Sequence, residues 1–283
     1  MPTLLSFGHG YSARAVGRLL LARGWRVIGT VRSEDRRAEV AVEGVEGVVW
    51  PDTDLTPHLD AATHLLTSVA PDDGGDPVLR DWRGAIAARA GRYDWAGYLS
   101  TTGVYGDRQG GWVDEGSPLA PATRRGRLRV EAEAAWAGIP GLPLHVFRLA
   151  GIYGPGRGPF EKVRSGAARR IVKPGQMFSR IHVEDIAQVV VASIDRPDPG
   201  AVYNVCDDDP APPEDVIAHA AALLGLPVPP AEDFATAEMT PMARSFYAES
   251  KRVRNDRIKA ELGVRLRYPD YRTGLRALLD AGE

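Results

Sequence analysis

Short apolar runs alternate with polar, helix-forming stretches along most of the chain, which predicts a parallel α/β sheet. The runs that indicate strands begin at residue 3 and continue at residues 25–32, 47–50, 63–70, 95–101, 144–149 and 201–205. Helices are expected after the first run and at residues 77–90, 183–194, 213–224, 250–262 and 271–281, and residues 227–241 are proline-rich and irregular. In such a fold, helices cover both faces and ligands bind outside the carboxyl ends of the strands.

The first run leads into a glycine turn that is typical of dinucleotide sites. Gly8, Gly10 and Ala13 fit the pattern G-x-G-x-x-G/A, in which the glycines permit a tight turn and a close approach to a pyrophosphate. The next helix would hold the phosphates, because its unpaired N–H groups and its dipole favour an anion. An ordinary strand-to-helix turn is the alternative. The candidate cofactor residues here are Gly8, His9, Gly10, Tyr11, Ser12 and Ala13.

The end of the second run predicts which nicotinamide cofactor binds. The adenosine ribose lies over this strand end, where an acid selects NAD and an arginine accommodates the 2′-phosphate of NADP. The strand ends at Arg32, no acid stands at its tip, and Arg36 and Arg37 follow. We therefore expect NADP, with NAD as the alternative because Glu34 and Asp35 could reach the ribose. A solvated helix face would also explain these arginines.

The end of the fourth run is expected to line the same groove. Ser68, Val69 and Ala70 stand at the carboxyl end of a strand, where cofactors bind in this class of fold. Residues 72–77 are rich in aspartate and glycine and are predicted to form a loop over the groove.

Composition narrows the class of protein further. The 283 residues are 44% hydrophobic and 25% charged, with a net charge of -2, so nothing in the charge balance favours nucleic acid or an anionic membrane as a partner. No apolar run is long enough to span a bilayer, and we expect a cytoplasmic protein with a small-molecule substrate and no metal. The single Cys206 lies in an apolar run and is expected to be a buried small hydrophobe. A homodimer stays open as the assembly state.

Several motifs occur in an order that resembles a known family. The segments are the shortened glycine motif at residues 8–13, Leu99-Ser-Thr-Thr-Gly-Val-Tyr-Gly106, Arg148-Leu-Ala-Gly-Ile-Tyr-Gly-Pro-Gly156, Arg180-Ile-His-Val-Glu-Asp185, Tyr203-Asn-Val205 and Tyr268-Pro-Asp-Tyr-Arg-Thr-Gly-Leu275. Over nearly the whole chain they resemble the extended short-chain dehydrogenase/reductase family of NAD(P)-dependent epimerases and dehydratases. The resemblance implies one Rossmann-type doubly wound parallel sheet over residues 1–283, with a small C-terminal substrate-side lobe mainly within residues 155–182 and 206–283.

The chain departs from that family at its catalytic pair. A Tyr-x-x-x-Lys pair carries the family's chemistry, and its lysine lowers the pKa of the tyrosine from about 10 and holds the nicotinamide ribose. In this chain Arg125 stands at the tyrosine position and Arg129 at the lysine position. Arg129 could still hold the ribose, but Arg125 keeps its proton and cannot act as the usual acid and base. The resemblance therefore implies an atypical member.

The resemblance assigns roles to four further residues. Thr101 aligns with the catalytic Ser/Thr, and Ser100 beside it would face the cofactor. Thr101 could instead only cap the strand end. Tyr105 and Tyr153 are the nearest phenols that could replace the missing tyrosine, Tyr153 on the substrate side, although both match positions where the family's tyrosine is chiefly structural.

Two residues are candidates for binding an anionic substrate. Arg180 and His182 fall in a segment that faces substrate phosphates in the family, and a guanidinium offers a bidentate fork to phosphate or carboxylate. The alternative is a surface ion pair of Arg180 with Glu184 or Asp185.

Two hypotheses of function follow. The chain is either an NADP-dependent oxidoreductase, epimerase or dehydratase for a small, sugar-like or anionic substrate, or a non-catalytic NADP(H)-binding sensor. Because fold does not imply function, the residues around the nicotinamide must decide between them.

Overall fold

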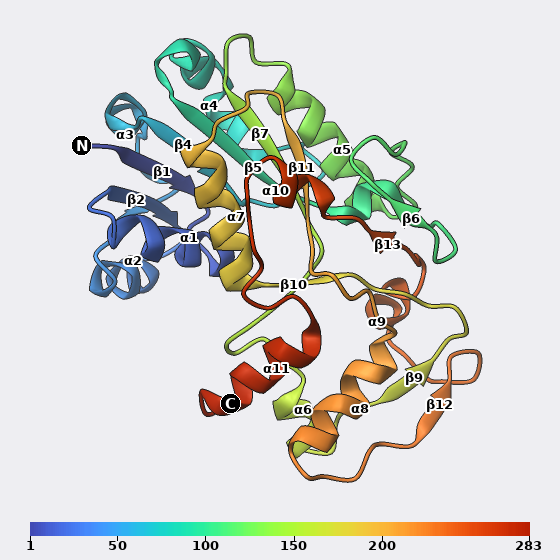
Figure 1. Cartoon of the computed structure of the whole chain (residues 1–283). Helices are drawn as coiled ribbons and strands as arrows, with labels where there is room; N and C mark the ends of the chain where they lie inside the picture. Colours follow the sequence, from blue (N-terminus) through green and yellow to red (C-terminus); the bar gives the residue numbers. More distant parts are fainter.

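The computed structural model describes residues 1–241 and 243–283, and the alternating segments form the predicted α/β sheet. Seven parallel strands lie in the order β11-β7-β5-β4-β1-β2-β3 (Figure 1). Their bounds are β1 Thr3–Phe7, β2 Arg26–Val31, β3 Glu46–Val49, β4 His64–Thr67, β5 Trp95–Thr101, β7 Leu144–Leu149 and β11 Val202–Val205. This is the strand order of a doubly wound Rossmann-type sheet, so the predicted fold class is confirmed.

Helices cover both faces of the sheet. Successive side chains of a strand point to opposite faces, and both sets are apolar here. Leu4 packs in one core and its neighbour Leu5 in the other. The first core receives α1 Tyr11–Leu21, α2 Glu34–Val42 and α7 Val183–Asp195. The second receives α3 Thr56–Ala61, α4 Pro77–Ala87 and α5 Arg124–Ala137. Two short 3₁₀ turns, η1 Ala90–Arg92 and η2 Thr102–Tyr105, flank β5.

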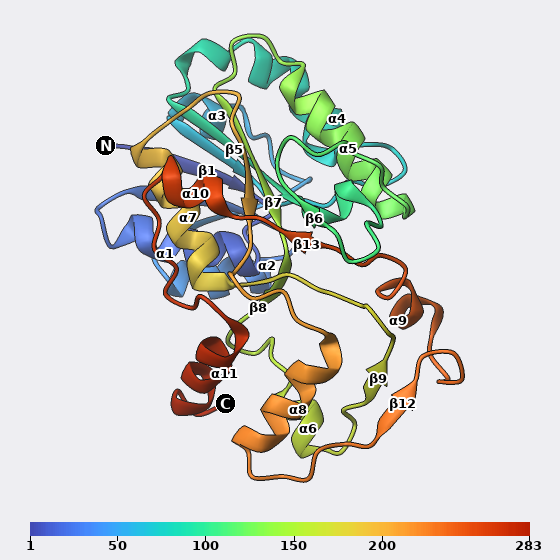
Figure 2. The same cartoon turned by 45° about the vertical axis from the view of Figure 1, so that its right-hand side comes forward.

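A smaller lobe lies beyond the carboxyl ends of the strands (Figures 1 and 2). It contains α6 Phe160–Arg164, β9 Arg170–Val172, α8 Pro213–Leu223, β12 Ala231–Asp233, α9 Pro241–Ser245 and α11 Tyr271–Asp280. A third core, with Phe160, Ala220 and Leu275 at its centre, holds α6, α8 and α11 together. The short parallel pair β9–β12 belongs to the lobe, and β8 Gly151–Tyr153 pairs with β10 Arg180–His182 where the lobe joins the sheet.

The predicted helix at residues 250–262 is wrong. Residues Arg252–Val253 form β13, which pairs with β6 Trp112–Val113, and only Asp256–Ala260 is helical as α10. The amides of Arg252 and Arg254 donate to the carbonyls of Gly111 and Val113, which holds this segment extended. The segment then returns to the sheet, where Ile258 is fully buried in the first core. This segment therefore packs on the sheet and not in the lobe.

No helix of the described residues is long and apolar enough to cross a membrane.

Candidate functional site

The glycine turn forms an open cradle at the start of α1. Gly8 has φ of +71°, and a Cβ there would lie 2.9 Å from Cγ2 of Val69, so both the backbone and the space require glycine. Above Gly10, the N-cap of α1, the nearest atom to an added Cβ would be the Gly8 carbonyl oxygen at 3.8 Å. No side chain caps this helix N-terminus. The turn therefore leaves room and unpaired amides for a pyrophosphate.

His9 supports the turn from inside the protein. Its amide donates to the Thr30 carbonyl at 2.9 Å, and its ring leaves no space for a side chain at Gly17 or Gly29. The ring is buried and neither nitrogen has a hydrogen-bond partner among the described residues. Burial lowers the pKa of His9 to about 4, although Glu43 acts in the opposite direction. Through its side chain, His9 therefore packs the turn and does not face the groove.

The other residues of the motif lie around the glycine turn. Ser12 and Ala13 are buried where α1 packs on the sheet, and the Tyr11 hydroxyl donates to the Pro155 carbonyl at 3.0 Å. Ser68 donates to the Gly8 carbonyl, and Val69 contacts Gly8. The structure thus brings the end of β4, residues 68–70, beside the glycine turn.

Arg32 lies at the tip of β2 as an exposed cation without a partner. Arg36 pairs with Glu39 and Arg37 pairs with Glu34 along the exposed side of α2. Arg32 has no hydrogen-bond or ion-pair partner among the described residues. Of the three arginines, Arg32 is therefore the one available to a ligand.

The end of β5 and the start of α5 meet at one place. The Thr101 hydroxyl accepts a hydrogen bond from the Gly103 amide at 3.1 Å and so caps η2. A Cβ on Gly126 would lie 2.8 Å from the Gly103 carbonyl oxygen, so the first turn of α5 packs directly on η2. Thr101 stays half-buried, and its own proton remains available for a substrate oxygen.

Arg125 and Arg129 occupy one face of α5. Nη1 of Arg129 donates to the Tyr98 hydroxyl at 3.0 Å and to the Leu99 carbonyl at 2.9 Å, so this face looks onto β5. Arg125 lies one helical turn nearer the helix start, toward the level of Thr101, and is exposed. Nε and Nη2 of Arg129 are left to donate to a ligand. Burial raises the pKa of Tyr98 to about 12, so this phenol cannot act as an acid near neutral pH.

Ser100 and Tyr105 belong to a buried network and not to the groove. The Ser100 hydroxyl donates a hydrogen bond to the Glu133 carboxylate. The same carboxylate accepts a hydrogen bond from Nη2 of Arg148 at 2.8 Å. Arg148 donates to the Tyr105 hydroxyl at 3.0 Å, and that hydroxyl donates to Asn204 at 2.7 Å. Burial raises the pKa of Tyr105 despite Arg148 beside it. This placement opposes the catalytic role expected for Tyr105 and the cofactor contact expected for Ser100.

Tyr153, His182 and Arg180 lie where the lobe joins the sheet. The Tyr153 ring packs edge-on against His182 with centroids 5.1 Å apart, and burial raises the pKa of its hydroxyl. His182 caps α7 by accepting from the Glu184 amide at 3.2 Å, and burial lowers its pKa to about 4. Nη1 of Arg180 donates to the carbonyls of Phe178 and Ala211 at 3.1 and 2.9 Å. Arg180 forms no ion pair with Glu184 or Asp185.

Sequence reasoning missed Asp207, which follows the end of β11. Its side chain is 1% exposed, and neither carboxylate oxygen has a hydrogen-bond partner among the described residues. Burial raises the pKa of Asp207 to about 8, against the opposing effect of Arg180. The strand pattern places this residue at the carboxyl end of the edge strand, but no motif in the sequence indicates that the carboxyl group turns inward.

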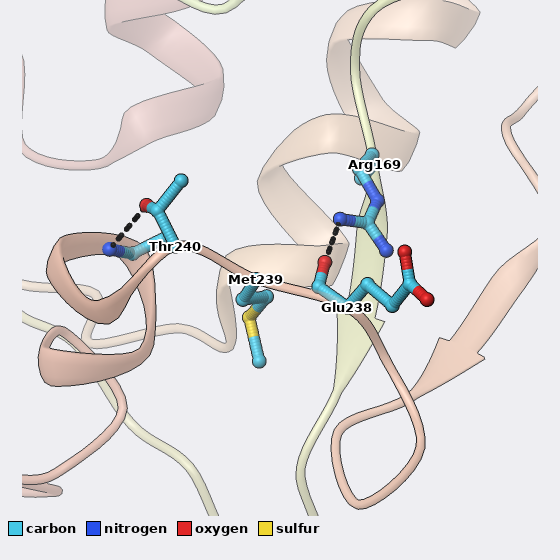
Figure 3. Close-up of a pocket in the computed structure, with 5 residues that line it drawn as sticks. Arg169, Glu238, Met239 and Thr240 are labelled. Atoms are coloured by element: carbon cyan, nitrogen blue, oxygen red, sulfur yellow. Dashed lines mark hydrogen bonds between the residues drawn. The ribbon is translucent and has the colours of Figure 1, made fainter.

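A separate hollow of about 490 Å³ lies in the lobe and is not the cofactor cradle. In Figure 3, Arg169 donates to the Glu238 carbonyl, and the Thr240 hydroxyl receives the amide of Ala243 at 3.2 Å. Arg169 also pairs with Glu232, so its charge is already neutralised. The described residues hold no group of three or more His, Cys, Asp or Glu side chains that could bind a metal ion.

Known proteins resemble the chain over nearly its full length, although no family model matches it. Protein YeeZ of Escherichia coli K12 is 29% identical over 276 residues, 93% of this chain and 95% of that protein. A functionally unknown conserved protein from Silicibacter pomeroyi is 64% identical, with a TM-score of 0.97 and 99% of both chains covered. A protein from Methylobacillus flagellatus that is classed as an NAD-dependent epimerase/dehydratase is 27% identical, with a TM-score of 0.75 over 99% and 98% of the chains.

Two more distant proteins share the fold or part of the sequence. The human epimerase family protein SDR39U1, solved with NADPH, is 19% identical with a TM-score of 0.75 over 98% and 99% of the chains. A 3-diazoavenalumate denitrifying reductase from Streptomyces is 29% identical over 178 residues, 58% of this chain and 55% of that protein.

The order of the strands, the glycine cradle and the similar solved structures together define a Rossmann-type fold. The chain is thus similar over nearly its full length to a protein classed as an NAD-dependent epimerase/dehydratase. The open space above Gly10 and the uncapped start of α1 fit the pyrophosphate of a nicotinamide cofactor.

Proposed function

We propose that this protein is an NADP-dependent oxidoreductase of the extended short-chain type, acting on a small, hydroxyl-rich or anionic substrate. The observation that carries the cofactor preference is Arg32, an exposed guanidinium at the tip of β2 without an ion-pair partner among the described residues. A 2′-phosphate over this strand end would pair with it. SDR39U1, which was solved with NADPH, lends the same preference weak support.

The residues at the end of β5 supply the proposed chemistry. A bound nicotinamide would exchange a hydride with the substrate. Thr101 would donate a hydrogen bond from its hydroxyl to a substrate oxygen, while the Gly103 amide holds that hydroxyl in place. Arg129 would hold the ribose through Nε or Nη2, and Arg125 would attract negative charge on the substrate. The reductase from Streptomyces supports redox chemistry in a related sequence.

A non-catalytic NADP(H) sensor is the second candidate function. It is favoured by the state of the candidate phenols, because Tyr98, Tyr105 and Tyr153 are buried with raised pKa values, and by the arginine that replaces the family's tyrosine at position 125. A sensor would bind the cofactor as tightly as an enzyme does but would turn over no substrate.

Titration of NADPH and NADH by fluorescence tests the proposal. Wild type should bind NADPH more tightly than NADH, and Arg32→Ala should remove the difference, because a lost charged contact costs about 1.5–3 kcal/mol. Arg36→Ala is the matched control, since Arg36 is neutralised by Glu39 and should not matter. Gly10→Val should abolish binding of both cofactors by filling the pyrophosphate space.

Two outcomes would contradict parts of this proposal. Equal affinities in wild type would remove the NADP preference and leave the family assignment intact. Normal NADPH binding with no oxidation of NADPH on a broad panel of carbonyl compounds would favour the sensor.

A further inference from the structure

A loop from the lobe side closes on the first turn of α1. The Tyr11 hydroxyl donates a hydrogen bond to the carbonyl of Pro155 at 3.0 Å. Gly154 has φ of +148°, and a Cβ there would lie 2.6 Å from the Tyr11 hydroxyl and 2.7 Å from Cγ1 of Val183. The loop is therefore held against the glycine cradle by a close approach that only glycine permits.

Arg157 at the end of this loop is a cation beside the cradle. Its guanidinium carbon lies 5.4 Å from the centroid of the Tyr11 ring, and its amide donates to the Gly154 carbonyl at 2.8 Å. The side chain is exposed and has no carboxylate partner among the described residues. Arg14, in the same helix turn as Tyr11, differs because Glu43 neutralises it.

Arg157 adds a positive charge close to the start of α1. The start of a helix carries partial positive charge, and the first turn of α1 contains no acidic residue and no capping side chain. The Glu283 carboxylate accepts a hydrogen bond from the Gly156 amide, beside Arg157, but it forms no ion pair with Arg157. An anion between Arg157 and the α1 amides would therefore interact with two positive charges.

We propose that Arg157 binds the pyrophosphate of the nicotinamide cofactor from the lobe side, opposite the amides of α1. This inference deepens the proposed function and rests on it for the identity of the ligand. It makes the cofactor a bridge between the sheet and the loop at residues 154–157. Arg157 would then raise affinity for NADPH and NADH alike, whereas Arg32 would distinguish between them.

Binding titrations with three probes separate the two arginines. The probes are NADPH, NADH and adenosine 2′-monophosphate, which carries the 2′-phosphate but no pyrophosphate and is measured by its displacement of NADPH. Arg157→Ala should weaken NADPH and NADH by the same factor, roughly tenfold, and leave adenosine 2′-monophosphate unchanged. Arg32→Ala should weaken NADPH and adenosine 2′-monophosphate and leave NADH unchanged.

Matched variants control for charge and folding. Arg169→Ala removes an arginine of the same lobe that is paired with Glu232, and it should bind all probes as wild type does. Arg157→Lys keeps the charge and should recover part of the affinity. Wild-type binding of NADPH and NADH by Arg157→Ala, or equal weakening of all three probes, would overturn the inference. A missing effect of Arg32→Ala would instead contradict the NADP preference, because the NADH arm still tests Arg157.

Discussion

The glycine cradle and the lobe differ in how they present polar groups to a ligand. At the cradle the backbone does this: the amides at the start of α1 point into space that Gly10 leaves open. On the lobe side, buried side chains do this. There Asp207, Gln176 and Glu214 each keep a buried oxygen without a hydrogen-bond partner among the described residues. A site built from backbone can be predicted from a motif, whereas one built from side chains requires the fold.

The buried network beside β5 belongs to neither region and joins α5, β5, β7 and β11. Glu133 and Arg148 are side chains of α5 and β7, 9% and 7% exposed, and Tyr105 extends their contacts to Asn204 at β11. A buried network of this kind loses stability when one of its charged members loses its partner.

The largest expected effect comes from breaking the network. Glu133→Gln should lower the free energy of unfolding by about 3–5 kcal/mol, because it leaves the buried Arg148 guanidinium without a counter-charge. Urea unfolding measures this change. The double variant Glu133→Gln with Arg148→Met should recover much of the loss, since neither charge then remains buried. A Glu133→Gln protein as stable as wild type would show that the pair is not desolvated.

A second, smaller effect is an acid sensitivity in each region. Burial lowers the pKa of His9 at the cradle and of His182 at the lobe junction to about 4. Each ring stays neutral when folded but takes up a proton below about pH 6.5 when unfolded. The unfolded state therefore binds more protons in this range, and the free energy of unfolding should fall by about 3 kcal/mol per histidine between pH 6.5 and pH 4.

Variants at the two histidines assign this acid sensitivity to a region. His9→Leu should reduce the pH dependence of chemical unfolding, and His182→Asn should reduce it equally while keeping a side-chain acceptor for the Glu184 amide. Unchanged pH dependence in both variants would mean that neither histidine is held neutral by burial.

The fold and the cradle could largely be predicted from the sequence, for a physical reason. Apolar runs define strands locally, and Gly8, Gly10 and Ala13 act through backbone geometry that a local motif encodes. The strand at Arg252–Val253 could not be predicted, because its extended form depends on hydrogen bonds to Gly111 and Val113 far along the chain. The burial of Tyr105 and Asp207 likewise follows from contacts between distant segments.

The smallest expected effect concerns Arg125 and Arg129, which stand at the positions of the family's Tyr-x-x-x-Lys pair but cannot carry out its acid–base chemistry. Gly126 packs on the Gly103 carbonyl, and Arg129 reaches the Leu99 carbonyl, so this helix face looks onto β5 near Thr101. If the face is part of the site, Arg129→Ala should weaken NADPH binding several-fold. Arg125→Ala should leave NADPH binding unchanged, because Arg125 lies one turn nearer the start of α5 and is proposed to meet the substrate.

Restoring the family's pair tests whether this face still has a catalytic geometry. Arg125→Tyr combined with Arg129→Lys would set a phenol beside Thr101, with an ammonium one helical turn away to lower its pKa. Weak NADPH oxidation on generic carbonyl compounds should then appear, measured by the loss of nicotinamide absorbance, with Thr101→Val in the same background as the control that removes it. A double variant that binds NADPH normally but oxidises none, together with wild-type NADPH binding by Arg129→Ala, would show that the two arginines form a solvated face. The cradle would then be the part of the family's site that this chain has kept.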